Sequence, residues 1–194
     1  MDRTDDDRHL PAGANALCGP PAPLRRGRAR LMGDALLYAA PGLDSRSTRH
    51  AASILASLDG RPVTVRTPQG EVRGDIVVVR PLVEKHVLAP GIPVVLIDLE
   101  PNHPAYRCFL GAGGPAGACA LAPQRYPGLL RLGRVFGLGH LHGPALDALA
   151  QAAVERVAAE FPPPPPIDIR LRQMMTLMDE QPRSTLVQLA RQVG

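Results

Sequence analysis

Five consecutive prolines at positions 162–166 are the feature that most constrains how this chain can fold. Proline fixes its own φ, lacks an amide hydrogen and disfavours helix in the residue before it, so neither a helix nor an inner strand can pass through this segment. A polyproline run extends by about 3.1 Å per residue and acts as a semi-rigid spacer. We therefore interpret 162–166 as a linker between two separate parts of the chain.

The part after the linker, residues 167–194, has the pattern of two short amphipathic helices joined by a polar turn. Proline at 182 ends the first helix, and the hydroxyls of Ser184 and Thr185 are suited to cap the second. Both helices carry apolar residues at i, i+3, i+4 and i+7, namely Leu171, Met174, Met175 and Met178, then Leu186, Leu189, Ala190 and Val193. The pattern predicts most of a helix-turn-helix, although a generic two-helix tail would have the same periodicity.

The part before the linker begins with short strand-like runs separated by turn signals. The strongest runs are 71–80, which contains four consecutive β-branched residues at 76–79, and 94–99. The connections are too short for crossover helices, so these strands predict an antiparallel barrel or sandwich. We expect a bulge or turn at Gly33-Asp34, a tight turn at Asp59-Gly60, a loop over 41–45, and either strand or helix over 50–58.

Residues 144–160 form the clearest helix pattern in the chain. Gly143-Pro144 places proline at the first helical position, where its missing amide hydrogen costs nothing. One stripe of the helix is apolar, formed by Leu146, Leu149, Ala150, Ala153 and Val157. This stripe could pack against the barrel or against a second copy of the chain. Residues 111–117 are rich in glycine but lack the Lys-Ser/Thr pair of a phosphate-binding loop, so we expect a flexible loop there.

The order of these motifs resembles that of the AraC-type transcriptional regulators. The runs LLYAAPGLDSRSTRH, LDG, DIVVVRPLVEKH and LEP look like the cupin-like sensor domain of that family, and 167–194 looks like the start of its DNA-binding domain. The resemblance implies an α+β chain, in which an N-terminal antiparallel cupin-like β-barrel of the jelly-roll type precedes α-helices and an incomplete helix-turn-helix. The expected divisions are a disordered leader at 1–28, a sensor barrel at 29–103, a helical segment at 104–161 that could dimerise, the linker at 162–166, and a partial DNA-binding domain at 167–194.

The resemblance also implies sites and partners. His50 and His86 match barrel positions that would contact a small-molecule effector, and hydrogen-bonded structural histidines are the alternative. Contacts to the DNA backbone are expected from the exposed residues of the partial domain, which are Ser184, Thr185, Gln188 and Arg191. The family's recognition helix would follow Gly194, so we expect a truncated regulator with weak or absent sequence-specific DNA binding, acting as a homodimer.

Catalysis and cofactors are not expected. Cupin metal enzymes carry a second histidine two residues after the first, but Ala52 stands there, and two histidines fall short of the usual three ligands. The three cysteines form no C-x-x-C pair, and the N-terminus lacks a signal-peptide pattern. We therefore expect a cytoplasmic protein with no membrane partner. The alternatives are a stand-alone cupin-fold small-molecule-binding protein or metal-dependent enzyme, and a nonfunctional fragment.

Overall fold

The computed structural model describes residues 24, 26–162, 166, 169–181 and 185–193. Most of the predicted leader, the middle of the predicted linker, Ser184 and Gly194 lie outside the described residues. The chain divides into two compact units, Met1–Phe161 and Pro162–Gly194, and each is described by itself. No helix in the described parts is long and apolar enough to cross a membrane.

The first unit contains a six-stranded sheet in which every neighbouring pair is antiparallel. In spatial order its strands are β1 (Arg28–Met32), β2 (Ala35–Ala40), β9 (Val94–Leu99), β4 (Ala52–Ser57), β7 (Ile76–Val79) and β10 (Ala118–Leu121). The predicted turn at Gly33-Asp34 joins β1 and β2 as a hairpin, and Gly33 has the positive φ of 58° that such a turn favours.

A second antiparallel sheet, of four strands, faces the first. Its strands in spatial order are β3 (Leu43–Thr48), β8 (Glu84–Ala89), β5 (Val63–Thr67) and β6 (Gly70–Gly74). A buried apolar cluster that includes Leu55, Val65, Val77 and Val87 fills part of the space between the sheets. The unit thus has the cupin-like, jelly-roll type of α+β architecture that the sequence predicted.

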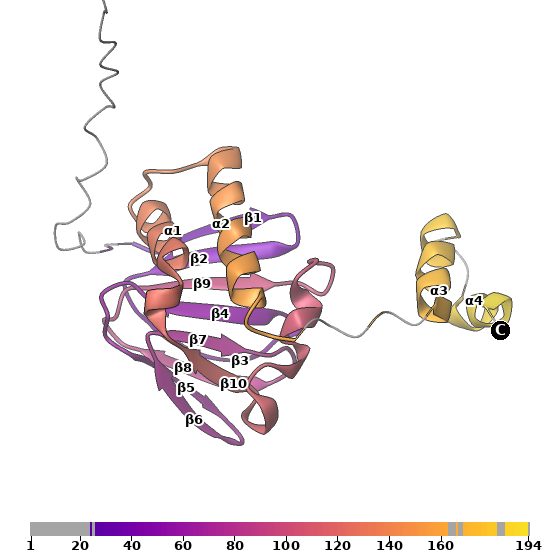
Figure 1. The fold of residues 1–194 in the computed structure, drawn as a ribbon, viewed down its shortest axis with the longest axis horizontal. Coiled ribbons are helices and arrows are strands. Elements are labelled where there is room, and N and C mark those ends of the chain that lie inside the picture. The colour runs from indigo at the N-terminus through magenta and orange to yellow at the C-terminus, as the bar shows by residue number, and fades with distance from the viewer. Residues whose placement is uncertain (1–23, 25, 163–165, 167–168, 182–184, 194) are drawn as a thin grey trace, which may run out of the picture. The chain divides into compact units, whose positions relative to one another are not determined.

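Helices α1 (Pro127–Gly137) and α2 (Gly143–Ala158) cover the other face of the six-stranded sheet (Figure 1). Leu132, Phe136 and Val157 of these helices are buried in one cluster with Ile54 and Ile97 of the sheet. Each such side chain stabilises the fold by about 1.5–3 kcal/mol through its burial. The apolar stripe predicted on the second helix therefore packs against the sheet.

Strand β4 is buried on both faces, since Ile54 belongs to the cluster under the helices and Leu55 to the cluster between the sheets. A strand with two buried faces shows no alternation of polar and apolar residues. This explains why the sequence of 50–58 fitted both helix and strand.

Three local predictions need correction. Residues 71–80 form two strands rather than one, because β6 belongs to the four-stranded sheet and β7 to the six-stranded sheet. The chain passes between sheets beside Gly74, where a Cβ would stand only 2.8 Å from that of Ala120. The predicted loop over 41–45 already contains the start of β3. The predicted helical segment 104–161 contains β10, which is too short to show a strand pattern.

Residues 104–126 contribute three short 3-10 helices, at Tyr106–Gly111, Gly114–Ala116 and Pro123–Arg125. Two of them fall within or overlap the glycine-rich stretch that was predicted to be a loop. Gly113 and Gly117, at either end of the second, have left-handed φ values of 70° and 68°. These glycines let the chain reverse sharply before it enters β10.

The second unit contains α3 (Ile169–Glu180) and α4 (Leu186–Val193), so both helices predicted after the prolines are present. Thr185 begins α4 with a capping box. The amide of Gln188 donates to Thr185 Oγ1 over 3.3 Å, and the amide of Thr185 donates back to Gln188 Oε1 over 2.8 Å. This reciprocal pair satisfies two amides that helix formation leaves without partners.

Candidate ligand-binding cavity between the sheets

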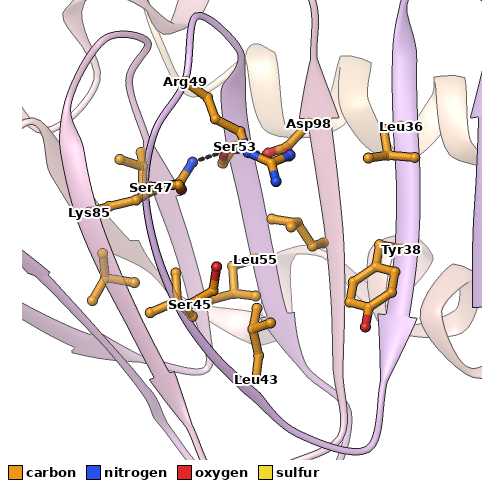
Figure 2. Close-up of a pocket in the computed structure, with 14 residues that line it drawn as sticks. Leu36, Tyr38, Leu43, Ser45, Ser47, Arg49, Ser53, Leu55, Lys85 and Asp98 are labelled. Carbon is orange, nitrogen blue, oxygen red and sulfur yellow. Dashed lines mark hydrogen bonds and ion pairs between the residues drawn. The ribbon is translucent and has the colours of Figure 1, made fainter. Parts of the chain in front are cut away.

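A cavity of about 250 Å³ lies between the two sheets (Figure 2). Strands from both sheets and the connection between β3 and β4 form its wall. The lining residues are Leu36, Tyr38, Leu43, Ser45, Ser47, Arg49, Ser53, Leu55, Val65, Val79, Lys85, Val87, Leu96 and Asp98.

Strand pleating explains which residues face the cavity. Successive side chains of a strand point to opposite faces of the sheet, so residues two apart share a face. Strand β8 contributes Lys85 and Val87, and β9 contributes Leu96 and Asp98. Each of these strands thus presents one charged and one apolar residue to the cavity.

The register of the strands sorts these residues into two levels. In the six-stranded sheet, Asp98 pairs with Ser53 and with Leu36, and in the four-stranded sheet Ser47 pairs with Lys85. We call Arg49, Ser47, Ser53, Lys85 and Asp98 the polar level, and the apolar side chains of Leu36 and Val79 lie beside them. Two residues further along each strand, at the next inward-facing position, Leu96 pairs with Leu55 and Tyr38, and Val87 pairs with Ser45 and Val65. We call these residues and Leu43 the apolar level. The cavity is therefore amphipathic.

A chain of hydrogen bonds crosses the polar level from one sheet to the other. The Lys85 amine donates to Ser53 Oγ, and the Ser53 hydroxyl donates to Asp98 Oδ1 (Figure 2). Arg49 Nη1 donates to the other carboxylate oxygen, Asp98 Oδ2, over 2.8 Å. Asp98 is 1% exposed and Lys85 5%, whereas the Arg49 side chain is half exposed at the rim.

The pKa of Lys85 is shifted chiefly by its burial. Removing the ammonium from water lowers the pKa of Lys85 below its ordinary value. The negative charge of Asp98 opposes this shift, and the positive charge of Arg49 adds to it. Asp98 is already ion-paired with Arg49, so it compensates the Lys85 charge only in part.

Neither predicted effector-binding histidine lines this cavity. His86 lies between Lys85 and Val87 on β8, so the pleat turns it to the opposite face, where its Nε2 lies 2.8 Å from Asp44 Oδ1. His50 is exposed in the bend before β4, and its backbone carbonyl accepts a hydrogen bond of 2.8 Å from Tyr106 Oη. The expectation that both histidines point into one barrel cavity is therefore corrected.

Three of the four predicted DNA-contact residues lie together at α4. Thr185 and Gln188 are exposed, but their side chains bond to each other in the capping box. Arg191 is exposed in the last turn, where a positive charge is favourable to the helix dipole. Ser184 lies outside the described residues.

Sequence reasoning missed Arg49, Ser53, Lys85 and Asp98. The available signal was a charged residue at an inward position of an otherwise apolar strand, as Asp98 is within VVLIDL. Identifying it required the inward face of each strand to be known, and a one-residue error inverts that assignment. Among the described residues, no group of three or more His, Cys, Asp or Glu side chains could hold a metal ion.

No protein-family model and no curated protein matches the sequence. Solved structures do match. The AraC-like transcriptional activator CuxR superposes with a TM-score of 0.53 at 12% identity, over 86% of this chain and 68% of that protein. Protein NMB1881 from Neisseria meningitidis matches 39% of this chain and 84% of its own at 17% identity, with a TM-score of 0.33. A cupin domain from Bordetella pertussis Tohama I matches 38% of this chain and 91% of its own length at 16% identity, with a TM-score of 0.28.

The fold is thus similar to that of the AraC-like activator CuxR, with a jelly-roll type of antiparallel sheet pair in the first unit. The superposition on CuxR carries this statement, because it alone of the three spans most of the chain. At 12% identity the likeness concerns the fold, and the function has to be argued from the site.

Proposed function

We propose that this chain is the effector-sensing part of an AraC-like transcriptional regulator, and that it binds a small molecule in the cavity between its sheets. The observation that carries the proposal is the amphipathic cavity, in which a buried polar network faces an apolar level. Binding sites for small molecules are typically apolar pockets with a few convergent polar groups. The role is that of a binding protein, with no catalytic step.

The AraC-like fold and the helix pair α3–α4 support the regulatory part of the proposal. In such a protein, the effector shifts a conformational equilibrium only if it binds the two conformations with different affinity. Arg49 is suited to this role, because its ion pair with Asp98 joins the β3–β4 connection to β9 across the cavity rim. A ligand that competes for Arg49 would change how this connection is held.

A homodimer remains part of the proposal. The apolar stripe of α2 is buried against the six-stranded sheet, so a dimer through this helix would use its opposite side. The exposed residues there are Ala148, Gln151, Ala152 and Glu155. Alanine at two of these positions would allow a second helix to approach closely.

The effector proposal can be tested with a cavity-blocking variant. Ser45→Phe places a ring in the cavity from β3, and Arg46→Phe places the same ring on the outer face of the same strand. Small-molecule ligands are identified from the rise in Tm that they cause in the purified chain. We expect such a ligand to stabilise the wild type and Arg46→Phe but not Ser45→Phe. Equal stabilisation of all three proteins would place the ligand elsewhere and overturn the proposal.

DNA binding is tested separately, by fluorescence anisotropy of labelled duplex DNA over a range of salt concentrations. Arg191→Gln should weaken binding at low salt and reduce the slope of log K against log salt by roughly one, as expected for the loss of a phosphate contact. The control is Arg66→Gln in the first unit, where Arg66 pairs with Glu71. Salt-dependent DNA binding that is weakened by Arg191→Gln would favour the regulator over the second candidate, a stand-alone cupin-fold binding protein. A cavity ligand combined with no DNA binding is compatible with both.

A further inference from the structure

We infer that the ligand of the cavity is a small amphiphilic monoanion, a carboxylate whose charged group binds Arg49 and Lys85 and whose apolar body lies against the apolar level. This inference rests on the proposed function, because it names the class of effector for the same cavity. Three properties of the cavity lead to it: an incompletely paired buried amine, the sum of its charges, and its size.

Lys85 is buried with one neutral partner. An ammonium group has three N–H donors, and among the described residues Lys85 donates one hydrogen bond, to the Ser53 hydroxyl. Both oxygens of Asp98 are engaged by Arg49 and Ser53. Within the part of the chain that the structure describes, the amine therefore lacks a direct negative partner. It is 95% buried and lines the cavity, so an acceptor that enters the cavity would supply one.

The charges of the lining residues do not cancel. Arg49 and Lys85 carry two positive charges, and Asp98 carries the single negative charge among the lining residues. A bound monoanion brings this sum to zero, whereas a cationic ligand would add to the excess. Charge-assisted hydrogen bonds from arginine and lysine to a carboxylate are also about twice as strong as neutral ones.

Size and the apolar level restrict the rest of the ligand. A volume of about 250 Å³ lies below the roughly 300–1,000 Å³ typical of small-molecule pockets, which favours a ligand smaller than a drug-sized molecule. Beyond the polar level, the wall consists mainly of Tyr38, Leu43, Leu55, Val87 and Leu96. A polyol would leave most of its hydroxyls without partners there, whereas a short hydrocarbon body would be buried favourably.

The test is isothermal titration calorimetry of the full chain with straight-chain carboxylates of roughly four to eight carbon atoms, a range set by the cavity volume. Primary alcohols of the same length are the matched neutral probes. We expect at least one carboxylate to bind roughly tenfold or more tightly than its alcohol. Ser45→Phe should abolish binding, and Arg46→Phe should leave it unchanged.

Two charge-removing variants locate the anion. Lys85→Met keeps an unbranched side chain that is one atom shorter and uncharged, and Arg49→Gln changes a half-exposed side chain at the rim. If one of the two variants does not fold, the other still tests the inference. Each should weaken carboxylate binding by roughly tenfold and leave alcohol binding unchanged. Arg66→Gln, on the outer face of the same sheet as Lys85, should change neither.

The outcomes separate this inference from the proposed function. If alcohols bind as tightly as carboxylates, and Ser45→Phe blocks both, the cavity is a ligand site but the anionic class is wrong. The same holds if only neutral or cationic compounds stabilise the chain through the cavity. If Ser45→Phe changes the binding of no compound of any class, both the inference and the proposed function are overturned.

Discussion

Gly133 of α1 lies directly against Val95 of β9, so that a Cβ on the glycine would stand 2.9 Å from Val95 Cγ1. It would meet the end of the Leu58 side chain as well. The helix therefore rests on the sheet at a point where only a hydrogen atom fits. Because α1 and α2 share one buried cluster with the sheet, this contact limits how closely the two helices can approach the strands.

Gly133→Ala should destabilise the fold by about 1 kcal/mol. Alanine favours a helix by about 1 kcal/mol over glycine, but the added methyl overpacks the helix–sheet contact, at a cost of about 1–3 kcal/mol. Gly128→Ala in the same helix is the control, because no atom lies within 4 Å of its added Cβ. It should be neutral or stabilising by up to about 1 kcal/mol. Urea denaturation measures both, and equal effects would show that α1 does not rest on the sheet at Gly133.

Asp98→Asn should be among the most destabilising polar substitutions in the first unit. It removes the negative charge that pairs with Arg49 and, through Ser53, supports buried Lys85. We expect a loss of about 2–4 kcal/mol, below the upper range for buried ion pairs because Arg49 can turn to solvent.

The double variant Asp98→Asn/Lys85→Met tests whether this loss comes from the unpaired amine. Removing both charges should recover part of the stability, with a coupling of about 0.5–3 kcal/mol in a double-mutant cycle. Denaturant midpoints of the four proteins give this coupling. Strict additivity would mean that Lys85 and Asp98 are energetically independent.

The stability of the wild type relative to Lys85→Met should rise with pH as the pH approaches 10.5, the ordinary pKa of a lysine, from below. In the folded state burial lowers the pKa of Lys85 below its ordinary value of 10.5, with Asp98 opposing and Arg49 adding to the shift. Between these two pKa values the unfolded chain binds more protons at Lys85 than the folded protein does. The Lys85 contribution to the free energy of unfolding therefore increases with pH in this window.

The comparison with Lys85→Met isolates this effect from other groups. Burial raises the pKa of Cys119, Tyr106 and Tyr126, so their contributions to stability decline at alkaline pH in both proteins. Urea denaturation at several pH values, plotted as the difference between wild type and variant, removes these shared terms. A difference that stays flat as the pH rises toward 10.5 would contradict the lowered pKa of Lys85.

Thr185→Ala should loosen the start of α4. It removes the hydroxyl that caps the Gln188 amide, and the loss of such a cap costs about 1 kcal/mol. Amide hydrogen exchange at residues 187–189 should become faster, while exchange in β4 and β9 should not change. Gln192→Ala, an exposed position within α4, is the control and should leave these rates unchanged or slower.

The parts of this protein that depend on local chemistry were determined by its sequence. The hairpin turn at Gly33-Asp34 needs a residue that tolerates positive φ, and the start of α4 needs a hydroxyl at Thr185. Both requirements are met by neighbouring residues. The antiparallel sheets, the helix over 144–160 and the two helices after the prolines were predictable for the same reason, because each depends on a repeat within one short segment.

The tertiary structure alone decided where the cavity lies and which side chains face it. Arg49, Ser53, Lys85 and Asp98 come from the β3–β4 connection and from strands β4, β8 and β9 of two different sheets, and their contacts join residues 32 to 49 positions apart. Their meeting depends on strand order and register across the sheets. The pleat then places Lys85 inside and its neighbour His86 outside, a distinction of one residue that the pattern of β8 did not settle before the packing of the sheets was known.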